Sequence, residues 1–417
     1  MKAVLINYGW GRTVSKRHKL INRKWPPLDL LNCTALLEKE GISIEVVDLN
    51  VKKYSDEFIN HKIGDSDIAF ITSSPIDRWQ CPYPVFDEFI LFVNALKQKN
   101  KIYIMGAHAS LYPHKIFKQT GVRGIIKGQP ESAVLKICKN ETASEIIECP
   151  NVDLNAFPPP AYEKIDLNDY YYELMGKRFA LLETSRGCPF HCLFCFKAMY
   201  GDKVKKKSLQ KIKDDIDYIV GRLKAKNIYF IDLEFTLDKE TAAKISEYII
   251  EKGYKFNWCC QTRVDAVDYE LFCLMHRAGC KLIHYGIESG SQRVLDMIQK
   301  RIDIKDITEA INMTKKAGIE TAGFFMFGFP GETEKEMNET ISYATKLNLD
   351  YASFHPVIAY PETGFIKNKC DYPDEFIAGV VRTAYLKFYL KPAYMLSRLF
   401  KPRQALNQLR LFRGLIG

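Results

Sequence analysis

Short apolar runs alternate with amphipathic stretches over about the first 140 residues of the chain. Near-continuous hydrophobicity in such runs is typical of parallel strands that helices cover on both faces. Helical periodicity is clearest over Leu28–Glu40 and Val85–Lys99. The predicted strands are Lys2–Asn7, Ser43–Leu49, Asp67–Thr72, Lys101–Met105 and Gly124–Lys127. Five such strands predict a flavodoxin-like (Rossmann-type) open parallel sheet, in which ligands bind at the carboxyl ends of the strands.

A proline-rich stretch then interrupts the pattern. Pro150 and the run 158–160 cannot continue a helix or a central strand. We therefore expect a sheet domain over 1–149, a linker over 150–177, a second domain over 178–370 and a helical region over 371–417.

The second domain repeats the alternation with a longer period. Ser208 is placed to cap one of its helices, and Thr333 with Glu336 forms a capping-box pattern before another. The predicted strands are Phe179–Thr184, Asn227–Asp232, Phe256–Gln261, Leu282–Ile287, Thr321–Gly328 and Tyr351–Ile358. Six strand-and-helix units with right-handed crossovers predict a partial (β/α)6 barrel of the TIM type.

Composition places the chain among ordinary globular proteins. It has 417 residues, of which 47% are hydrophobic and 26% charged. There is no apolar run long enough to span a bilayer and no signal-peptide pattern at the N-terminus, so we expect a cytoplasmic protein.

The net charge of +10 is concentrated at one end of the chain. Residues 376–417 hold eight Lys or Arg and no acid, which leaves about +2 for the rest. We therefore expect no DNA binding. The basic C-terminal region interleaves leucines with its charges, so it suits either a helix packed on the barrel or a peripheral contact with an anionic membrane.

Three of the twelve cysteines lie close together, directly after the first strand of the second domain. Cys188, Cys192 and Cys195 stand on one loop, which also contains Gly187 and Pro189. Three thiolates can hold three irons of a [4Fe-4S] cluster and leave the fourth iron open to another ligand. A zinc site that recruits His191 is the alternative, although only Cys192 and Cys195 have the usual spacing for zinc.

The loop resembles the signature of the radical SAM superfamily, including the aromatic Phe194 before the last cysteine. The likeness continues along the barrel through Tyr229–Thr236, Gln261–Asp265, Tyr285–Ser291 and Phe327–Thr333. It implies a radical SAM barrel whose cluster, held by the three cysteines, binds S-adenosylmethionine (SAM) and cleaves it reductively to a 5'-deoxyadenosyl radical.

The resemblance also implies cofactor contacts at Phe194 and at four charged residues on strand ends. These four are Asp232, Glu234, Arg263 and Glu288. The second strand departs from the family's common Gly-Gly-Glu pattern, since it reads Asp232-Leu233-Glu234. Charges at strand ends can also simply pair with one another.

The N-terminal domain resembles the cobalamin-binding domains that are fused to many radical SAM enzymes. The likeness lies in Trp25–Leu31, Glu45–Leu49, Met105–Ser110 and Gly128–Glu131. It implies that cobalamin binds with His108 near the corrin ring. The pattern that supplies a histidine to cobalt in other cobalamin proteins is absent, because no histidine here has an aspartate two residues before it.

The combined resemblance implies a cobalamin-dependent methyltransferase that acts on an unactivated carbon or phosphorus centre of a small-molecule or lipid-like substrate. A radical SAM cyclase or rearrangement enzyme without methyl transfer, an RNA methylthiolating enzyme and a non-catalytic zinc-bearing binding protein are the alternatives. The lysines at 203 and 205–207 suit the docking of a flavodoxin- or ferredoxin-type electron donor.

Overall fold

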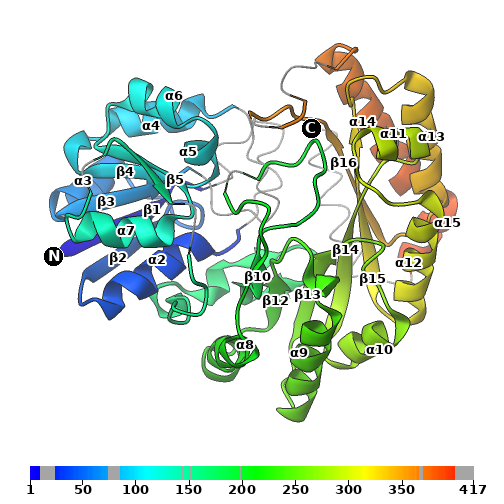
Figure 1. The fold of residues 1–417 in the computed structure, drawn as a ribbon, viewed down its shortest axis with the longest axis horizontal. Helices are drawn as coiled ribbons and strands as arrows, with labels where there is room; N and C mark the ends of the chain where they lie inside the picture. The colour runs from blue at the N-terminus through cyan, green and yellow to red at the C-terminus, as the bar shows by residue number, and fades with distance from the viewer. Residues whose placement is uncertain are drawn as a thin grey trace.

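The computed structural model describes residues 1–9, 24–73, 85–142, 144–149, 152–197, 199–361, 363–365 and 370–399. It contains two parallel six-stranded sheets (Figure 1). The tail from residue 400, which was predicted to be helical, lies outside these residues.

The first sheet has the order β2-β1-β3-β4-β5-β6, and all of its strands are parallel. They are β1 (Lys2–Asn7), β2 (Ser43–Asp48), β3 (Ile68–Thr72), β4 (Ile102–Met105), β5 (Gly124–Gly128) and β6 (Ile146–Cys149). The first five strands confirm the flavodoxin-like prediction. The sixth was not predicted, because its four residues include an exposed glutamate and resemble a loop.

Helices cover both faces of this sheet. They are α2 (Leu28–Lys39), α3 (Asp56–Gly64), α4 (Asp87–Ala95), α5 (Ala107–Leu111), α6 (Pro113–Thr120) and α7 (Pro130–Cys138). Successive residues of β1 belong to opposite cores: Ala3 and Leu5 pack with residues of α2 and α7, whereas Val4 and Ile6 pack with residues of α3, α4 and α6. This alternation is the two-residue period of a strand buried on both sides.

The second sheet has the order β9-β12-β13-β14-β15-β16 and is also entirely parallel. Its strands are β9 (Phe179–Leu182), β12 (Asn227–Phe230), β13 (Asn257–Thr262), β14 (Cys280–Glu288), β15 (Glu320–Phe327) and β16 (Tyr351–Pro356). The sheet curves into a partial barrel, as predicted (Figure 1). The barrel is open because its edge strands, β9 and β16, do not pair with each other.

The barrel helices follow the strands in turn. They are α8 (Leu209–Ile216), α9 (Lys239–Glu251), α10 (Tyr269–Arg277), α11 (Gln292–Met297), α12 (Ile304–Lys316) and α13 (Glu334–Lys346). Both predicted N-caps are confirmed: Ser208 Oγ accepts a hydrogen bond from Lys211 N, and Thr333 and Glu336 form a reciprocal capping box.

Aromatic side chains link the N-terminal part of the chain to the barrel. Trp25, which precedes α2, lies 5.3 Å from Tyr172 and 5.8 Å from Tyr229 between ring centroids. Tyr229 in turn stacks on His284 at 5.0 Å, and His284 stacks on Phe324. This buried stack belongs to the packed interior of the barrel.

Two further helices, α14 (Asp374–Tyr389) and α15 (Pro392–Leu399), end the described chain. Tyr389 donates its hydroxyl to Ala352 O on β16 at 2.7 Å, and Phe388 is buried. The start of the basic region therefore packs on the barrel, whereas Lys401, Arg403, Arg410 and Arg413 lie outside the described residues. No helix in the described part of the chain is long and apolar enough to cross a bilayer.

Candidate active site

The cysteine loop follows the carboxyl end of β9 and is closed at its base by a pair of short antiparallel strands. Strand β10 (Ser185–Arg186) pairs with β11 (Lys205–Lys206), and Cys188 follows directly. Gly187 has a φ of +89°, and an added Cβ would collide with the carbonyl oxygen of Lys203. Glycine is therefore required where the chain enters the loop.

Backbone hydrogen bonds fix the rest of the loop. Leu193 N donates to Ile298 O at 3.0 Å, and Gly364 N donates to Leu193 O at 2.9 Å. The Lys197 ammonium donates to the carbonyl oxygens of Cys188 and Phe190 and so holds the cysteine turn from inside. The three cysteines are thus presented by a loop that is tied to two other segments of the barrel.

The three thiols influence one another electrostatically. Burial, followed by the nearby Glu234 carboxylate and Cys192, raises the pKa of Cys188 to about 11. Burial and the other two cysteines raise the pKa of Cys195 to about 12. These raised pKa values disfavour the thiolate forms of Cys188 and Cys195, so a cation such as iron would be needed to hold them as thiolates. No group of three His, Cys, Asp or Glu side chains among the described residues could hold a single metal ion. A cubane cluster, by contrast, gives each cysteine its own iron.

Charged side chains form a wall beside the loop, at the carboxyl ends of β12, β13 and β14. Glu234 follows β12, Arg263 follows β13, and Glu288 ends β14 with a left-handed φ of +67°. Burial raises the pKa of Glu234 to about 7, although Lys300 and Arg263 oppose that shift. The Arg263 guanidinium lies 3.8 Å from the centroid of the Phe190 ring and chelates Asp265.

Two buried atoms of this wall have no hydrogen-bond partner among the described residues: Glu234 Oε2 and Arg263 Nη1. Buried polar atoms are normally satisfied, so this pair indicates a polar ligand. A carboxylate complements an ammonium group, and a guanidinium complements a carboxylate. The amino-acid portion of SAM carries both groups, so the residues present fit this cofactor.

Lys300 was missed by the sequence analysis. Its Nζ lies 3.0 Å from Glu288 Oε1, and both side chains are 8% exposed. Burial alone would lower the pKa of Lys300, but Glu288, Cys192 and Glu234 more than offset this and raise it. Lys300 is flanked by Gln299 and Arg301, whose φ values of 55° and 54° are left-handed. No sequence pattern distinguishes Lys300 from the many other lysines of the chain, because it simply follows a short helix.

The remaining predicted contacts are placed as follows. Asp232 accepts hydrogen bonds from Thr184 N at 3.0 Å, Thr184 Oγ1 at 2.6 Å and Ser185 Oγ at 2.6 Å, so it secures the start of the cysteine loop. The Phe194 ring lies 5.8 Å from Lys300 Nζ, within the site. Cofactor contacts at these two positions stay predictions.

His108 lies in α5, just beyond the carboxyl end of β4, and is fully buried. Its Nδ1 lies 2.8 Å from Ser73 Oγ, and its ring stands 5.0 Å from that of Phe86. The position matches the predicted edge of the first sheet, and the contact with a corrin ring stays a prediction.

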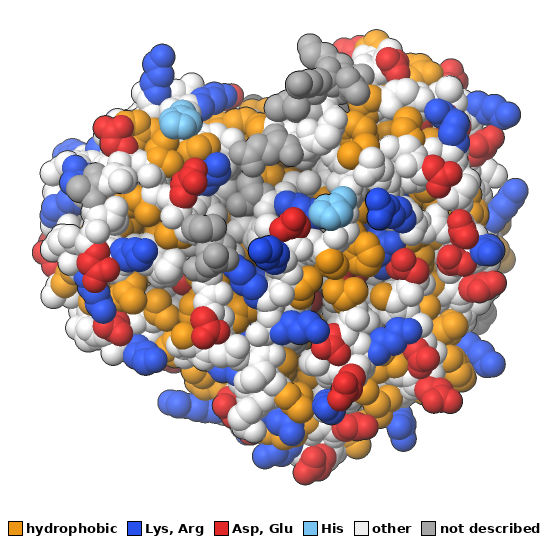
Figure 2. Space-filling model, viewed as in Figure 1, with side chains coloured by type: hydrophobic (Ala, Val, Ile, Leu, Met, Phe, Trp, Pro, Cys, Tyr) orange, Lys and Arg blue, Asp and Glu red, His pale blue; other side chains and the backbone are white. Residues whose placement is uncertain are grey.

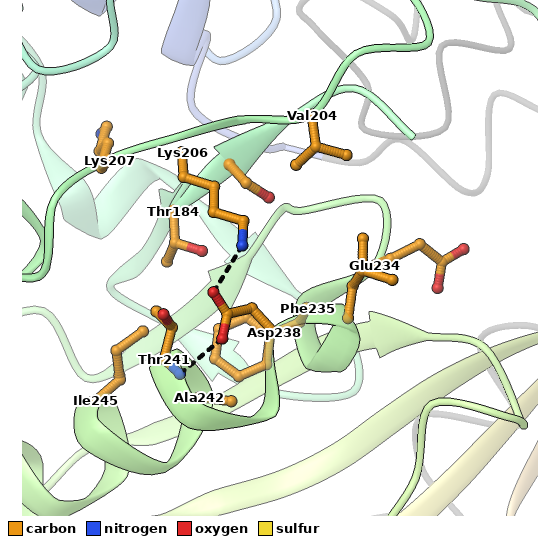
Figure 3. A pocket seen from close by; sticks show the side chains of 12 residues that line it. Thr184, Val204, Lys206, Lys207, Glu234, Phe235, Asp238, Thr241, Ala242 and Ile245 are labelled. Atoms are coloured by element: carbon orange, nitrogen blue, oxygen red, sulfur yellow. Dashed lines mark hydrogen bonds and ion pairs between the residues drawn. The ribbon is translucent and has the colours of Figure 1, made fainter. Parts of the chain in front are cut away.

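A small pocket opens beside Glu234, between the β10–β11 strand pair and α9 (Figure 3). Lys206 Nζ contacts Asp238 Oδ2 at 2.7 Å across it, and Asp238 also caps α9 through Thr241 N. The volume of this pocket, about 20 Å³, has room for about one water molecule. It is too small for SAM, and the carboxylate of Glu234 points away from Lys206 and Asp238.

Comparison with known proteins bears on this geometry. Residues 182–344 match the model of the Radical SAM superfamily. This part of the chain is a radical SAM domain. The matched residues run from the end of β9 into α13, and they include the three loop cysteines and the whole charged wall.

Two curated relatives carry informative names. An uncharacterized methyltransferase from Pyrococcus horikoshii is 26% identical over 97% of this chain and 96% of its own length. An anaerobic magnesium-protoporphyrin IX monomethyl ester cyclase from Rubrivivax gelatinosus is 25% identical over 65% of this chain and 53% of its own length.

A solved structure shares the fold. The radical SAM methyltransferase TsrM from Kitasatospora setae, determined with cobalamin and a [4Fe-4S] cluster, superimposes with a TM-score of 0.67. The match covers 87% of this chain and 73% of TsrM, at 16% sequence identity. It confirms the arrangement of a flavodoxin-like domain followed by a partial barrel.

Proposed function

We propose that this radical SAM enzyme is a cobalamin-dependent methyltransferase that acts on an unactivated carbon or phosphorus centre. The observation that supports radical chemistry is that the cysteine loop lies beside two buried atoms of oppositely charged groups, Glu234 Oε2 and Arg263 Nη1. Neither atom has a hydrogen-bond partner in the described part of the chain. Methyl transfer is supported by the name of the full-length Pyrococcus relative and by the fold shared with TsrM.

The carboxyl edge of the first sheet supports the cobalamin proposal. Gly106 after β4 and Gly128 at the end of β5 have φ values of +100° and +90°, which side chains rarely adopt. Ser110 joins these two turns, because its Oγ donates to Gly106 O at 2.9 Å and accepts from Gly128 N at 3.0 Å. The result is a pair of hydrogen-bonded glycine turns whose backbone a large flat cofactor can approach closely.

The protein's own residues would bind and orient the cofactors. Cys188, Cys192 and Cys195 would hold the [4Fe-4S] cluster, Glu234 the ammonium group of SAM, and Arg263 its carboxylate. Lys300 would neutralise Glu288 and the nearby thiolate of Cys192. When bound, the cluster supplies the electron that cleaves SAM, and cobalamin carries the methyl group. Burial of this wall excludes water from the reacting groups.

Anaerobic reconstitution tests the proposal. Wild type is expected to bind about four irons and four sulfides, to release 5'-deoxyadenosine from SAM with a reductant, and to retain added hydroxocobalamin through gel filtration. A variant with all three loop cysteines changed to alanine should lose the cluster, whereas Cys273→Ala on α10 should keep it. Wild type that assembles no cluster, or that binds zinc instead, would overturn the proposal.

Ring formation or rearrangement without methyl transfer is the second candidate function, and the cyclase relative favours it. Mass spectrometry of extracts treated with and without enzyme separates the two. Products heavier by one or more methylene units support methyl transfer, whereas a loss of hydrogen or an unchanged formula supports the alternative.

The electron donor is proposed to be of the flavodoxin or ferredoxin type. Lys207 is buried in an ion pair with Asp215, and Lys206 pairs with Asp238, so a docking site would rely on the exposed Lys203. Figure 2 shows acidic and basic side chains interspersed over the face viewed there. Lys203→Glu should slow reduction of the cluster by flavodoxin but not by dithionite, and equal rates would exclude this surface.

We also propose that the substrate is a small or lipid-like molecule and that the C-terminal region contacts a membrane peripherally. Leu390, Met395 and Leu396 are large, apolar and exposed, and Lys391 lies among them. Binding to anionic vesicles should exceed binding to neutral vesicles and should fall in Leu396→Gln. The matched control is Leu91→Gln, at an exposed leucine of α4. Equal, weak binding to both vesicle types would refute the contact.

A further inference from the structure

Arg186, two residues before the first cluster cysteine, is buried in a charged cluster. Its Nε and Nη2 donate to Glu183 at 2.8 Å each, and Nη2 also donates to Glu131 at 2.6 Å. Nη1 donates to Gln129 Oε1 at 3.1 Å. Arg186 is 1% exposed and its two carboxylate partners are 0% and 2% exposed, so water does not screen these contacts.

The partners of Arg186 come from both sheets. Glu183 directly follows β9 of the barrel, whereas Gln129 and Glu131 lie at the turn from β5 to α7. That turn belongs to the carboxyl edge of the first sheet, where cobalamin is proposed to bind. Asn32 of α2 adds a second link, because its Nδ2 donates to Glu183 Oε1 at 3.2 Å.

Aromatic rings restrict the guanidinium further. The rings of Phe157 and Tyr200 lie 5.6 and 5.1 Å from its carbon. A planar guanidinium that is chelated by one carboxylate, bonded to a second and flanked by rings has little freedom to rotate. Lysine at this position could not reproduce these contacts.

The residues after the cysteines contact the first domain as well. Ser110 of α5 lies 2.8 Å from the sulfur of Met199, and Leu111 packs in one buried cluster with Phe196, Met199 and Tyr200. The cysteine loop is therefore attached to the first domain at both of its ends, by charge before Cys188 and by apolar packing after Cys195.

We propose that Arg186 is a positioning residue that fixes the cysteine loop against the carboxyl edge of the first sheet and so holds the cluster at one distance from that edge. This inference rests on the proposed function. A fixed distance is needed there because cobalamin and SAM must both reach the same substrate. The residue acts through the loop and touches neither cofactor.

A distance measurement on the cluster-loaded protein tests this. An azide-bearing residue replaces the exposed Lys118 of α6 and carries a nitroxide, and pulsed electron paramagnetic resonance records its distance distribution to the reduced cluster. We expect one narrow distribution in wild type. Arg186→Met should broaden it about twofold, because domains move relative to one another once fixed interface contacts are lost.

Matched variants separate positioning from general destabilisation. Lys315→Met removes a 2.8 Å ion pair with Asp350, whose two partners both belong to the barrel. This variant should leave the distance distribution narrow. Arg186→Lys should not restore it. If Arg186→Met fails to fold, Glu131→Gln takes its place, since it removes the charge from the first-domain side and should also broaden the distribution.

The outcomes separate the two proposals. A cluster signal in wild type with an equally narrow distribution in Arg186→Met, or in Glu131→Gln, overturns the role of Arg186 alone. Broadening in Lys315→Met as well shows loss of stability rather than positioning and also overturns it. Absence of any cluster in wild type overturns the proposed function and this inference with it.

Discussion

The buried pair of Lys300 and Glu288 allows a sharp test of the site's electrostatics. At 3.0 Å, two unit charges attract by about 5–6 kcal/mol at the effective dielectric constant of 20 that suits proteins. Dehydrating both groups offsets much of this attraction, so the intact pair contributes little net stability. Removing only the lysine is different, because Glu288 stays buried without its counter-charge, close to the wall's other carboxylate.

We therefore expect Lys300→Met to lower the free energy of unfolding of the barrel by about 3–5 kcal/mol. Glu288→Gln in the Lys300→Met background should recover at least about half of that loss, because the unpaired charge is then gone. The double-mutant cycle should show a coupling energy of about 2–3 kcal/mol.

Urea denaturation of the cluster-free protein, followed by circular dichroism, measures these differences. If the two domains unfold separately, the shift belongs to the barrel transition. Additive effects of the two substitutions, or a loss below about 1 kcal/mol in Lys300→Met, would refute the reasoning, since the pair would then be screened by water.

Three further predictions concern other parts of the molecule. Arg263→Met should weaken SAM binding to the reconstituted protein about ten- to hundredfold, the value of one charge-assisted hydrogen bond, and an unchanged Kd in equilibrium dialysis would contradict this. Gly187→Ala should lower iron incorporation severalfold, whereas Gly201→Ala, which has a similar positive φ of +74° but open space around its Cβ, should not. Burial raises the pKa of Asp48 from 3.8 to about 6 despite hydrogen bonds from Tyr170 and Asn7. The folded state then binds the proton more tightly, so stability falls as pH rises from about 4 to 6 and stays lower above it. Asp48→Asn should remove this penalty, about 3 kcal/mol at pH 8 and little at pH 4, and equal gains at both pH values in denaturation curves would refute it.

Both sheets were predicted from local pattern. All six barrel strands and five of the six strands of the first sheet were identified, because a strand buried on both faces is a continuous apolar run between turn residues. The strand β6 was missed because it is short and carries Glu148 outward. The caps at Ser208 and Thr333 were also predicted, since capping depends on residues within one turn.

The sequence by itself determined where most strands lie along the chain, the class of fold, and the grouping of three cysteines on one loop. Each of these depends on residues that are near one another in the chain. Only the tertiary structure decided what surrounds the cysteines. Lys300 reaches Glu288 across 12 residues, and Arg186 reaches Glu131 across 55. Such partners meet only when the sheets are assembled, and a buried charge is recognised only once its burial is known.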